Sequence, residues 1–544
     1  MTMEKIKTDD LSRKLHARNF TKWGLDMNLF VSLVSALLVF GFIAFTITMP
    51  EQSAKIFGDI NNYLNEHFNW LFVLTINAAF IFLILTGFSK FGRIRLGGFK
   101  AKPEYSNFAW YAMLFSAGIG IGIFFYGVAE PIYHLNIPEA LRTGSPFDNF
   151  KIMYMHWGAH AWALYGLVAA GLGYFSYNKN LPFSFRSLFY PLIKDKIFGL
   201  WGDIIDTVAV LAVLFGLATS LGLGAQQINS GLNYVFGVPV NAIVQIILIV
   251  VITLIATLSV VSGIAKGIKF LSQANTIISS VLLLAILLIG PTAYILSTYL
   301  SSMGLYLREF FFVGMFTATT PDAMAWQGNW TIFYWAWWIS WTPFVGTFIA
   351  RISKGRTIKE IAIGTVILPT IIITFAMTIL GAAGTYINEV NDGVIAAAIN
   401  NDIATSMFEM FKYLSSSPII QNVLSCMALI AIVLFFVTSS DSGSLVVDNL
   451  TSSGKKDSPR TQRVFWASME GLIAIAVLLL GGKAALKTIQ SAVIITGLPF
   501  AILLIIMMFS LIKELKVSYK QHEHNTIIKL KKNMHKISVD TEYK

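Results

Sequence analysis

The chain has 544 residues, of which 55% are apolar and only 13% are charged. Soluble proteins carry about 25% charged residues, so this composition excludes an ordinary soluble domain and favours an integral membrane protein. The net charge of +11 lies largely in predicted loops between apolar segments, which argues against a nucleic-acid partner. A single cysteine, Cys426, excludes an internal disulfide framework.

Charge-free windows long enough to cross a bilayer recur along the chain. They are 27–50, 67–89, 105–129, 152–178, 207–265, 270–307, 323–350, 361–388, 413–440 and 488–512. The window 207–265 must hold two spans, divided near Gly237, and a further span at 464–482 contains Glu470. The sequence therefore predicts an all-α integral membrane protein with 12 transmembrane helices. It predicts no cleavable signal peptide, because the segment before the first window is polar and charged.

Basic residues gather in alternate loops. The loops after spans 2, 4, 6, 8 and 10 are rich in lysine and arginine, and most opposite loops lean acidic. Because basic loops stay in the cytoplasm, both chain ends are predicted to be cytoplasmic. We expect a cytoplasmic N-terminal segment (1–26), a membrane domain (27–513) and a basic cytoplasmic tail (514–544). The tail is predicted either to lie on anionic lipid or to be solvated.

Span 3 contains a run of small residues from Ser116 to Gly122. Gly118, Gly120 and Gly122 alternate in it, and each weakens a helix interior by about 1 kcal/mol relative to alanine. Close helix packing is the alternative, but this spacing does not place the glycines on one packing face. A nucleotide-binding loop is excluded because the flanking strand is missing. We expect a broken helix whose free backbone groups contact a ligand.

Span 4 carries three aromatic residues that can approach one helix face, namely Trp157, Trp162 and Tyr165. Core packing or an interfacial belt is the alternative to a ligand role. His156 and His160 have the spacing of a metal-binding pair. No glutamate or cysteine in this stretch accompanies them as a third ligand, so we expect ordinary hydrogen-bonded histidines.

Span 8 is rich in tryptophan. Its charge-free stretch 330–350 contains five, at positions 330, 335, 337, 338 and 341. Membrane tryptophans normally gather at the water interfaces, but Trp341 lies near the middle of this span. Indole faces attract organic cations by roughly 0.5–2 kcal/mol each, so Trp337, Trp338 and Trp341 suit a desolvated organic cation. Pro343 predicts a second helix break beside them.

The two predicted breaks, in spans 3 and 8, are five spans apart and lie in helices that run in opposite directions. Secondary transporters often consist of two inverted repeats, each beginning with a broken helix. We therefore predict repeats of spans 3–7 and 8–12, with spans 1 and 2 additional. Span 10 ends with hydroxyl residues that include Thr438 and Ser439. These either bond back to their own helix or supply hard oxygen ligands to a sodium ion.

Three stretches, 117–131, 333–358 and 435–444, resemble the signatures of the betaine/choline/carnitine transporters. Their sequences are AGIGIGIFFYGVAEP, FYWAWWISWTPFVGTFIARISKGRTI and FFVTSSDSGS. The resemblance implies a LeuT-type inverted repeat, a homotrimer in the cell membrane, and sodium-coupled uptake of trimethylammonium osmolytes. It implies no enzymatic activity and no cofactor besides the coupling ion.

The resemblance also implies two sites. The substrate box matches Trp157, Trp162, Tyr165, Trp337, Trp338 and Trp341, next to the glycine motif. The sodium site matches the carbonyls of Ser116, Ile119 and Phe435 and the hydroxyls of Thr438 and Ser439. Sodium-independent members carry an arginine in span 5, and this chain has none there, which favours sodium coupling.

Gly122 bears on the choice of substrate. Choline carriers resembling this family often have an acid at this position, and Gly122 supplies none. The sequence therefore favours glycine betaine, a zwitterion that carries its own carboxylate, over choline, and carnitine stays open as an alternative. A proton-coupled carrier stays open. An ion channel would line its path with charged rings or a carbonyl filter, and the sequence shows neither. A membrane-embedded enzyme would need a cluster of His, Asp or Glu near the middle of the membrane. Uptake measured with and without a sodium gradient separates these classes.

Overall fold

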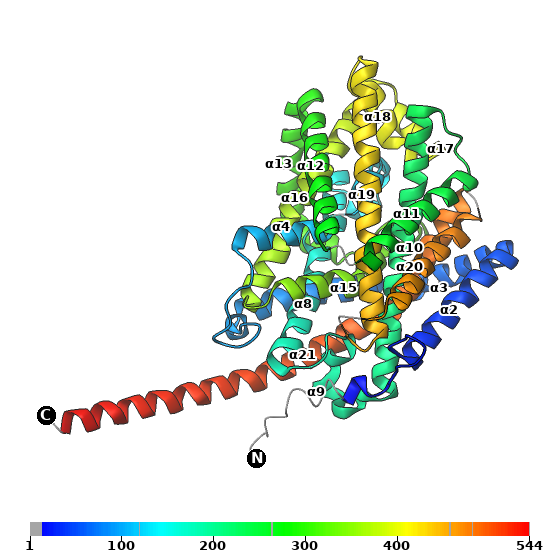
Figure 1. Ribbon diagram of the computed structural model, residues 1–544. Helices are drawn as coiled ribbons and strands as arrows, with labels where there is room; N and C mark the ends of the chain where they lie inside the picture. The colour runs from blue at the N-terminus through cyan, green and yellow to red at the C-terminus, as the bar shows by residue number, and fades with distance from the viewer. Residues whose placement is uncertain (1–13, 119, 263–264, 456–457, 481, 543–544) are drawn as a thin grey trace.

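The structure is a computed structural model that describes residues 14–118, 120–262, 265–455, 458–480 and 482–542. The described chain is almost entirely helical, as Figure 1 shows. Its one sheet is a short antiparallel ribbon near the N-terminus, in which β1 (Asn19–Phe20) pairs with β2 (Met27–Asn28). This confirms the all-α fold class predicted from composition.

The first half of the chain contains these helices: α2 (Leu29–Thr48), α3 (Pro50–Phe88), η1 (Lys90–Arg93), α4 (Asn107–Gly118), α5 (Gly122–Tyr126), α6 (Ala129–Tyr133), η2 (His134–Asn136), η3 (Glu139–Leu141), α7 (Asp148–Trp157), α8 (Ala159–Lys179), η4 (Phe185–Phe189), α9 (Tyr190–Ile193), η5 (Lys194–Phe198), α10 (Leu200–Phe236) and α11 (Ala242–Ser262).

The second half contains these: α12 (Ala265–Ile289), α13 (Thr292–Gly314), α14 (Pro321–Gln327), the π-helical turn η6 (Gly328–Ile332), α15 (Phe333–Ile352), α16 (Ile358–Val390), α17 (Val394–Asn401), η7 (Ile403–Thr405), α18 (Ser406–Leu414), α19 (Pro418–Thr451), α20 (Arg460–Leu478) and α21 (Gly482–Glu542).

Eight helices of the described chain are long and apolar enough to cross a membrane, and they lie within α2, α3, α10, α11, α12, α16, α19 and α21. The expected division of 207–265 is confirmed, because α10 ends at Phe236 and Gly237 adopts the left-handed conformation with φ of 70°. The other four predicted spans, 3, 4, 8 and 11, coincide with interrupted or less apolar helices. The full count of 12 stays a prediction.

The predicted break in span 3 is present. Helix α4 ends at Gly118 and α5 begins at Gly122, so the chain leaves the helix within the glycine motif. Gly120 lies in this non-helical stretch. Ile119 falls outside the described residues, and so do the side chains of residues 115–118.

Span 4 contains a break that the sequence analysis did not predict. Helix α7 ends at Trp157 and α8 begins at Ala159, with Gly158 between them at φ −92° and ψ −141°. A Cβ at Gly158 would come within 2.4 Å of the Tyr154 carbonyl oxygen, so the site accepts only glycine without rearrangement. The break places Trp157 on the last turn of a separate helix.

The predicted break at Trp341 to Pro343 in span 8 is wrong. Helix α15 runs from Phe333 to Ile352 with Pro343 inside it. Membrane helices tolerate proline where hydroxyl side chains and neighbouring helices satisfy the freed backbone groups. Thr342 Oγ1 donates to the Trp338 carbonyl at 2.7 Å, whereas the carbonyl that Pro343 leaves without its helical N–H donor is that of Ile339. The irregular segment of span 8 is instead the π-helical turn η6 that precedes α15.

The break in span 3 therefore has no counterpart inside α15, and the inverted repeat stays a prediction. Window 270–307 also differs from expectation, because Pro291 separates α12 from α13. Helix α15 packs against α8, α10 and α21, so the aromatic stretches of spans 4 and 8 meet in the interior.

The last helix crosses the predicted boundary between membrane domain and tail. Helix α21 runs through residue 513 without a break and then projects away from the body, as the red helix in Figure 1 shows. Its first tail residue remains attached, because Glu514 pairs with Lys179 at 2.6 Å. The side chains of residues 521–544 lie outside the described part, so the lipid-binding prediction stays open.

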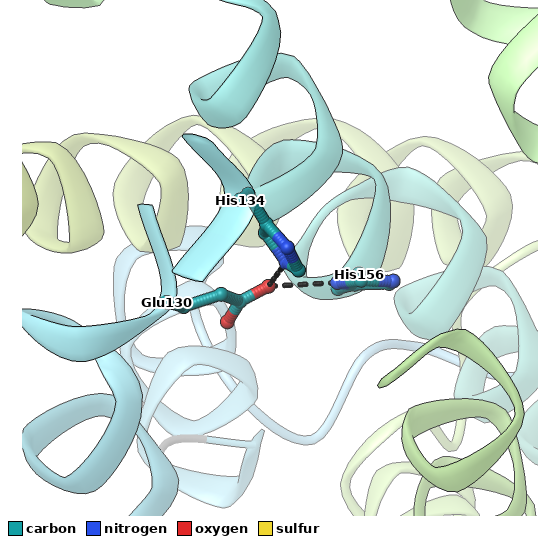
Figure 2. A group of neighbouring side chains, drawn as sticks. All are labelled: Glu130, His134 and His156. Atoms are coloured by element: carbon teal, nitrogen blue, oxygen red, sulfur yellow. Dashed lines mark hydrogen bonds and ion pairs between the residues drawn. The ribbon is translucent and has the colours of Figure 1, made fainter. Parts of the chain in front are cut away.

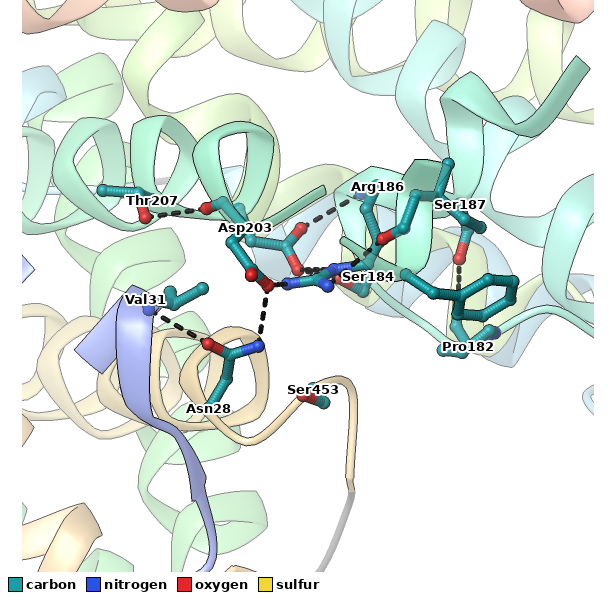
Figure 3. A network of polar contacts seen from close by, with 12 residues as sticks. Asn28, Val31, Pro182, Ser184, Arg186, Ser187, Asp203, Thr207 and Ser453 are labelled. Carbon is teal, nitrogen blue, oxygen red and sulfur yellow. Dashed lines mark hydrogen bonds and ion pairs between the residues drawn. The ribbon is translucent and has the colours of Figure 1, made fainter. Parts of the chain in front are cut away.

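A buried ionic cluster connects the loop after α8 with the start of α10. The Arg186 guanidinium lies between two carboxylates, at 2.9 Å from Asp203 Oδ1 and 2.6 Å from Asp206 Oδ2. Figure 3 shows its contact with Asp203. Asp203 also accepts hydrogen bonds from Asn28 at 2.8 Å and Arg18 at 3.0 Å. The cluster therefore attaches the N-terminal ribbon to α10, the helix that supplies one wall of the cavity described next.

Candidate substrate cavity

Four indoles surround a small cavity at the broken helix. It is lined by Gly120, Ile121, Gly122, Trp157, Ser220, Trp337, Trp338 and Trp341. These residues come from predicted spans 3, 4, 5 and 8, so the cavity forms where four segments of the chain meet. It holds about 10 Å³, roughly the space of one water molecule. The indoles must therefore move apart before a trimethylammonium group can enter.

Hydrogen bonds hold three of these indoles by their N–H groups. Trp341 Nε1 donates to the Gly216 carbonyl at 3.1 Å, and Trp338 Nε1 donates to the His156 carbonyl at 2.8 Å. Trp157 Nε1 donates to Glu130 Oε2 at 2.7 Å. The indole N–H of Trp337 is buried and has no hydrogen-bond partner among the described residues. The polar edges of three rings are thus occupied, which leaves their faces for apolar or cationic contacts.

The glycine motif lets the rings approach the backbone. A Cβ at Gly122 would lie 2.5 Å from Trp157 Cη2 and 2.9 Å from Trp337 Cη2. A Cβ at Gly120 would lie 3.5 Å from Trp341 Cη2, an ordinary contact. Gly122 therefore faces the cavity as expected, and any side chain there displaces two indoles.

Two residues of the predicted substrate box, Trp162 and Tyr165, do not line the cavity. Their rings pack against each other edge to face, with centroids 5.7 Å apart. Tyr165 reaches the cavity wall through Trp338, at a centroid distance of 6.0 Å. Gly118 ends α4, and its place relative to the cavity lies outside what the structure describes. The structure thus brings four of the six predicted aromatic residues together with Gly120 and Gly122.

The predicted sodium ligands are only partly described. Ile119 and the side chain of Ser116 lie outside the described residues. Thr438 Oγ1 donates to the Leu434 carbonyl at 2.8 Å, which is the back-bonded arrangement expected without an ion. Ser439 is 9% exposed, and the Phe435 ring packs 5.9 Å from Phe124 of α5. This segment of α19 therefore lies beside the broken helix, as the sodium-site hypothesis requires.

A buried carboxylate below the cavity escaped the sequence analysis. Figure 2 shows one oxygen of Glu130 directed at two imidazole rings, with His156 Nδ1 at 2.7 Å and His134 Nε2 at 3.2 Å. Its other oxygen accepts from Trp157 and from the Tyr334 hydroxyl, both at 2.7 Å. His156 is thus a hydrogen-bonded histidine, as expected, but its partner comes from span 3.

Two other residues of the site were also missed. Ser220 and Ile121 line the cavity, and their sequence context is unremarkable for a membrane helix. Glu130 offered a signal, because an acid at the end of an apolar span is costly to bury and is usually functional.

Comparison with known proteins gives one family. The family model described as betaine/carnitine/choline family transporter matches residues 30–520. A relative named glycine betaine transporter 1, from Vibrio parahaemolyticus, is 42% identical over 94% of this chain and 98% of its own length. A glycine betaine/proline/choline transporter of the same organism is 41% identical over 91% of each chain. A glycine betaine transporter of Acinetobacter baylyi is 41% identical over 91% of this chain and 74% of its own.

Proposed function

This chain belongs to the betaine/carnitine/choline family of transporters, and we propose that it takes up glycine betaine, a quaternary ammonium osmolyte, together with sodium. It is a multi-pass membrane transporter and not an enzyme. The observation that carries the proposed substrate is the cavity between Trp157, Trp337, Trp338 and Trp341. Faces of several indoles in a site shielded from water suit a cation that cannot donate hydrogen bonds.

The polar groups near the cavity favour a zwitterion over a net cation. No acid is among the described residues that line the cavity, and Glu130 binds the N–H of Trp157 without lining the cavity itself. A net cation would therefore meet no carboxylate directly, whereas glycine betaine brings its own. The free N–H of Trp337 is a donor that a substrate carboxylate can use. The Ser220 hydroxyl also lines the cavity, but it donates to the Gly216 carbonyl at 3.4 Å. Choline and carnitine, which are also quaternary ammonium compounds, are the alternatives.

Sodium coupling is proposed on chemical grounds. Hydroxyl and carbonyl oxygens suit a hard monovalent cation, and the segment Phe435 to Ser439 offers both next to a helix whose carbonyls are released at its break. The contact of Phe435 with Phe124 supports this position. A proton-coupled carrier is the alternative, and it would need no such oxygen cluster.

The proposed architecture follows the family. We propose the LeuT-type inverted repeat, cytoplasmic termini and a homotrimer, with the cavity opening alternately to either side. Mass measurement in detergent tests the trimer, and cysteine labelling of the terminal segments tests their side of the membrane.

Competition for uptake tests the proposed substrate. Labelled glycine betaine is supplied to cells that lack their own betaine uptake and that express this protein. Unlabelled glycine betaine should compete at lower concentration than choline, carnitine, proline betaine or ectoine. A lower inhibitory concentration for choline or carnitine would identify the alternative substrate.

A further inference from the structure

We infer that Glu130 is a positioning residue for the aromatic box, which fixes its indoles and raises its affinity for a quaternary ammonium cation. This inference rests on the proposed function. It goes beyond that function because the residue does not line the cavity and would act only through the rings that do.

The carboxylate is completely enclosed and fully used. Glu130 is 0% exposed, and its two oxygens accept four hydrogen bonds. The donors come from three different segments of the chain, namely α7, α15 and the turn η2 after α6. A carboxylate with this many donors is held in one position, and it holds its partners in turn.

Through these partners Glu130 reaches three of the four cavity indoles. It binds the Trp157 N–H directly. It binds the hydroxyl of Tyr334, whose ring stacks on Trp337 at 6.3 Å and 30°. It binds the ring of His156, whose backbone carbonyl accepts the N–H of Trp338. One buried group therefore connects the walls of the box that come from spans 4 and 8.

Glu130, His134 and His156 also have the composition of a metal site, since their ligand atoms all lie within 4.8 Å of one another. The hydrogen bonds argue for another role. Oε1 already accepts from both rings, and His156 Nε2 lies 3.1 Å from the Thr331 hydroxyl. The carboxylate is satisfied by protein donors alone, so the cluster needs no ion to be stable.

The negative charge adds an electronic effect. An indole that donates its N–H to a carboxylate is polarised, and its face becomes more negative, which strengthens attraction to a cation. Trp157 is so placed, with its N–H on Glu130 and its ring edge at Gly122 on the cavity. Glutamine cannot replace glutamate in this role, because its amide has one acceptor oxygen and an NH2 group that would face other donors.

Three variants test the inference by uptake kinetics at equal amounts of transporter in the membrane. Glu130→Gln should raise the KM for glycine betaine at least tenfold, with maximal uptake within threefold of wild type. Glu130→Asp keeps the charge and should recover part of the affinity. Glu470→Gln is the matched control, because Glu470 is also 0% exposed but binds Ser440 and Ser444 of α19. Its KM should stay within twofold of wild type.

A double-mutant cycle tests the connection to the box. Trp157→Phe removes the N–H donor and keeps an aromatic face. If Glu130 acts through Trp157, the fold increase in KM of the double variant should be well below the product of the fold increases of the two single variants. Fully multiplicative effects, or a Glu130→Gln KM within twofold of wild type, would overturn the inference.

A milder variant keeps the test valid if Glu130→Gln does not reach the membrane. Tyr334→Phe removes one donor from Glu130 and leaves the charge in place, and its KM should rise at least twofold. An unchanged KM in both Tyr334→Phe and Glu130→Asp would contradict the inference. Wild-type protein that takes up no quaternary ammonium compound would instead contradict the proposed function itself.

Discussion

Trp157 and Trp338 stand edge to face, with ring centroids 5.2 Å apart and an interplanar angle of 84°. They belong to different helices, and each has its N–H held by a neighbour, Glu130 for one and the His156 carbonyl for the other. These two perpendicular rings line adjacent sides of the cavity, and Trp337 and Trp341 also line it, so the four indoles together form an aromatic box.

Removing Trp341 should open one wall of the box. Trp341→Ala is expected to lower glycine betaine uptake at least about tenfold, because it deletes an indole that lines the cavity. Membrane levels should remain near wild type and are measured by immunoblot. Trp201→Ala is the control, since Trp201 is 60% exposed and remote from the cavity lining. Uptake by Trp341→Ala within threefold of wild type would contradict the assignment.

The two glycines of the broken helix should respond differently to a methyl group. Gly122→Ala places a Cβ at 2.5 Å from Trp157 and should impair uptake strongly. Gly120→Ala places one at 3.5 Å from Trp341 and should be tolerated far better. Equal effects of the two substitutions on betaine uptake would show that the close approach at Gly122 has no functional role.

An acid at Gly122 should also change substrate preference. Gly122→Asp adds a carboxylate beside the box, which attracts a net cation and repels the carboxylate of betaine. Desolvation removes much of this energy, so we expect about a tenfold rise in the ratio of choline to betaine uptake. Because any side chain at Gly122 displaces the rings of Trp157 and Trp337, the uptake of both substrates should also fall below that of wild type. A ratio that shifts toward betaine would contradict this account.

The hydroxyls of α19 should matter for sodium. Thr438→Ala combined with Ser439→Ala removes two hard oxygen ligands and should raise the sodium concentration for half-maximal uptake. Ser468→Ala is the control, because its hydroxyl bonds back to Val464 on α20. An unchanged sodium dependence in the double variant would place the coupling ion elsewhere.

The buried ionic cluster of Arg186, Asp203 and Asp206 should stabilise the folded protein. Arg186→Met leaves Asp203 and Asp206 buried without their cation and should cost about 3–5 kcal/mol. The measurement is the fraction of detergent-solubilised protein that stays folded after heating. Arg308→Met is the control: Arg308 is 64% exposed beside Glu309, so its loss should cost less than about 1 kcal/mol. Equal heat resistance of the two variants would contradict the role of the cluster.

The sequence predicted the parts of the fold that depend on composition and backbone chemistry. Apolar windows located the eight helices that are long and apolar enough to cross a membrane in the described chain, and the alternating glycines located the break between Gly118 and Gly122. The prediction from Pro343 was wrong because membrane helices tolerate a proline where their surroundings allow it, and α15 continues through this position. The break at Gly158 was missed because a single glycine in a membrane span usually serves packing.

The candidate site was predicted as a set of aromatic residues, but its arrangement was not. Trp162 and Tyr165 lie on the expected helix, yet the break at Gly158 turns Trp157 toward the cavity and leaves the other two behind it. The role of Glu130 was missed because its partners, His156 and Tyr334, lie in other spans, and the residue spacing within one helix does not show which spans are in contact. Tertiary contacts of this kind are not encoded in the spacing within one helix.

We propose that the box binds glycine betaine and that a sodium gradient drives its uptake. Purified protein in proteoliposomes, loaded with potassium and diluted into labelled glycine betaine with external sodium or external potassium, separates this coupling from its alternatives. We predict saturable accumulation above the external concentration only with inward sodium, and its loss in Trp341→Ala. Equal accumulation in potassium, or accumulation driven by a proton gradient alone, would contradict the account.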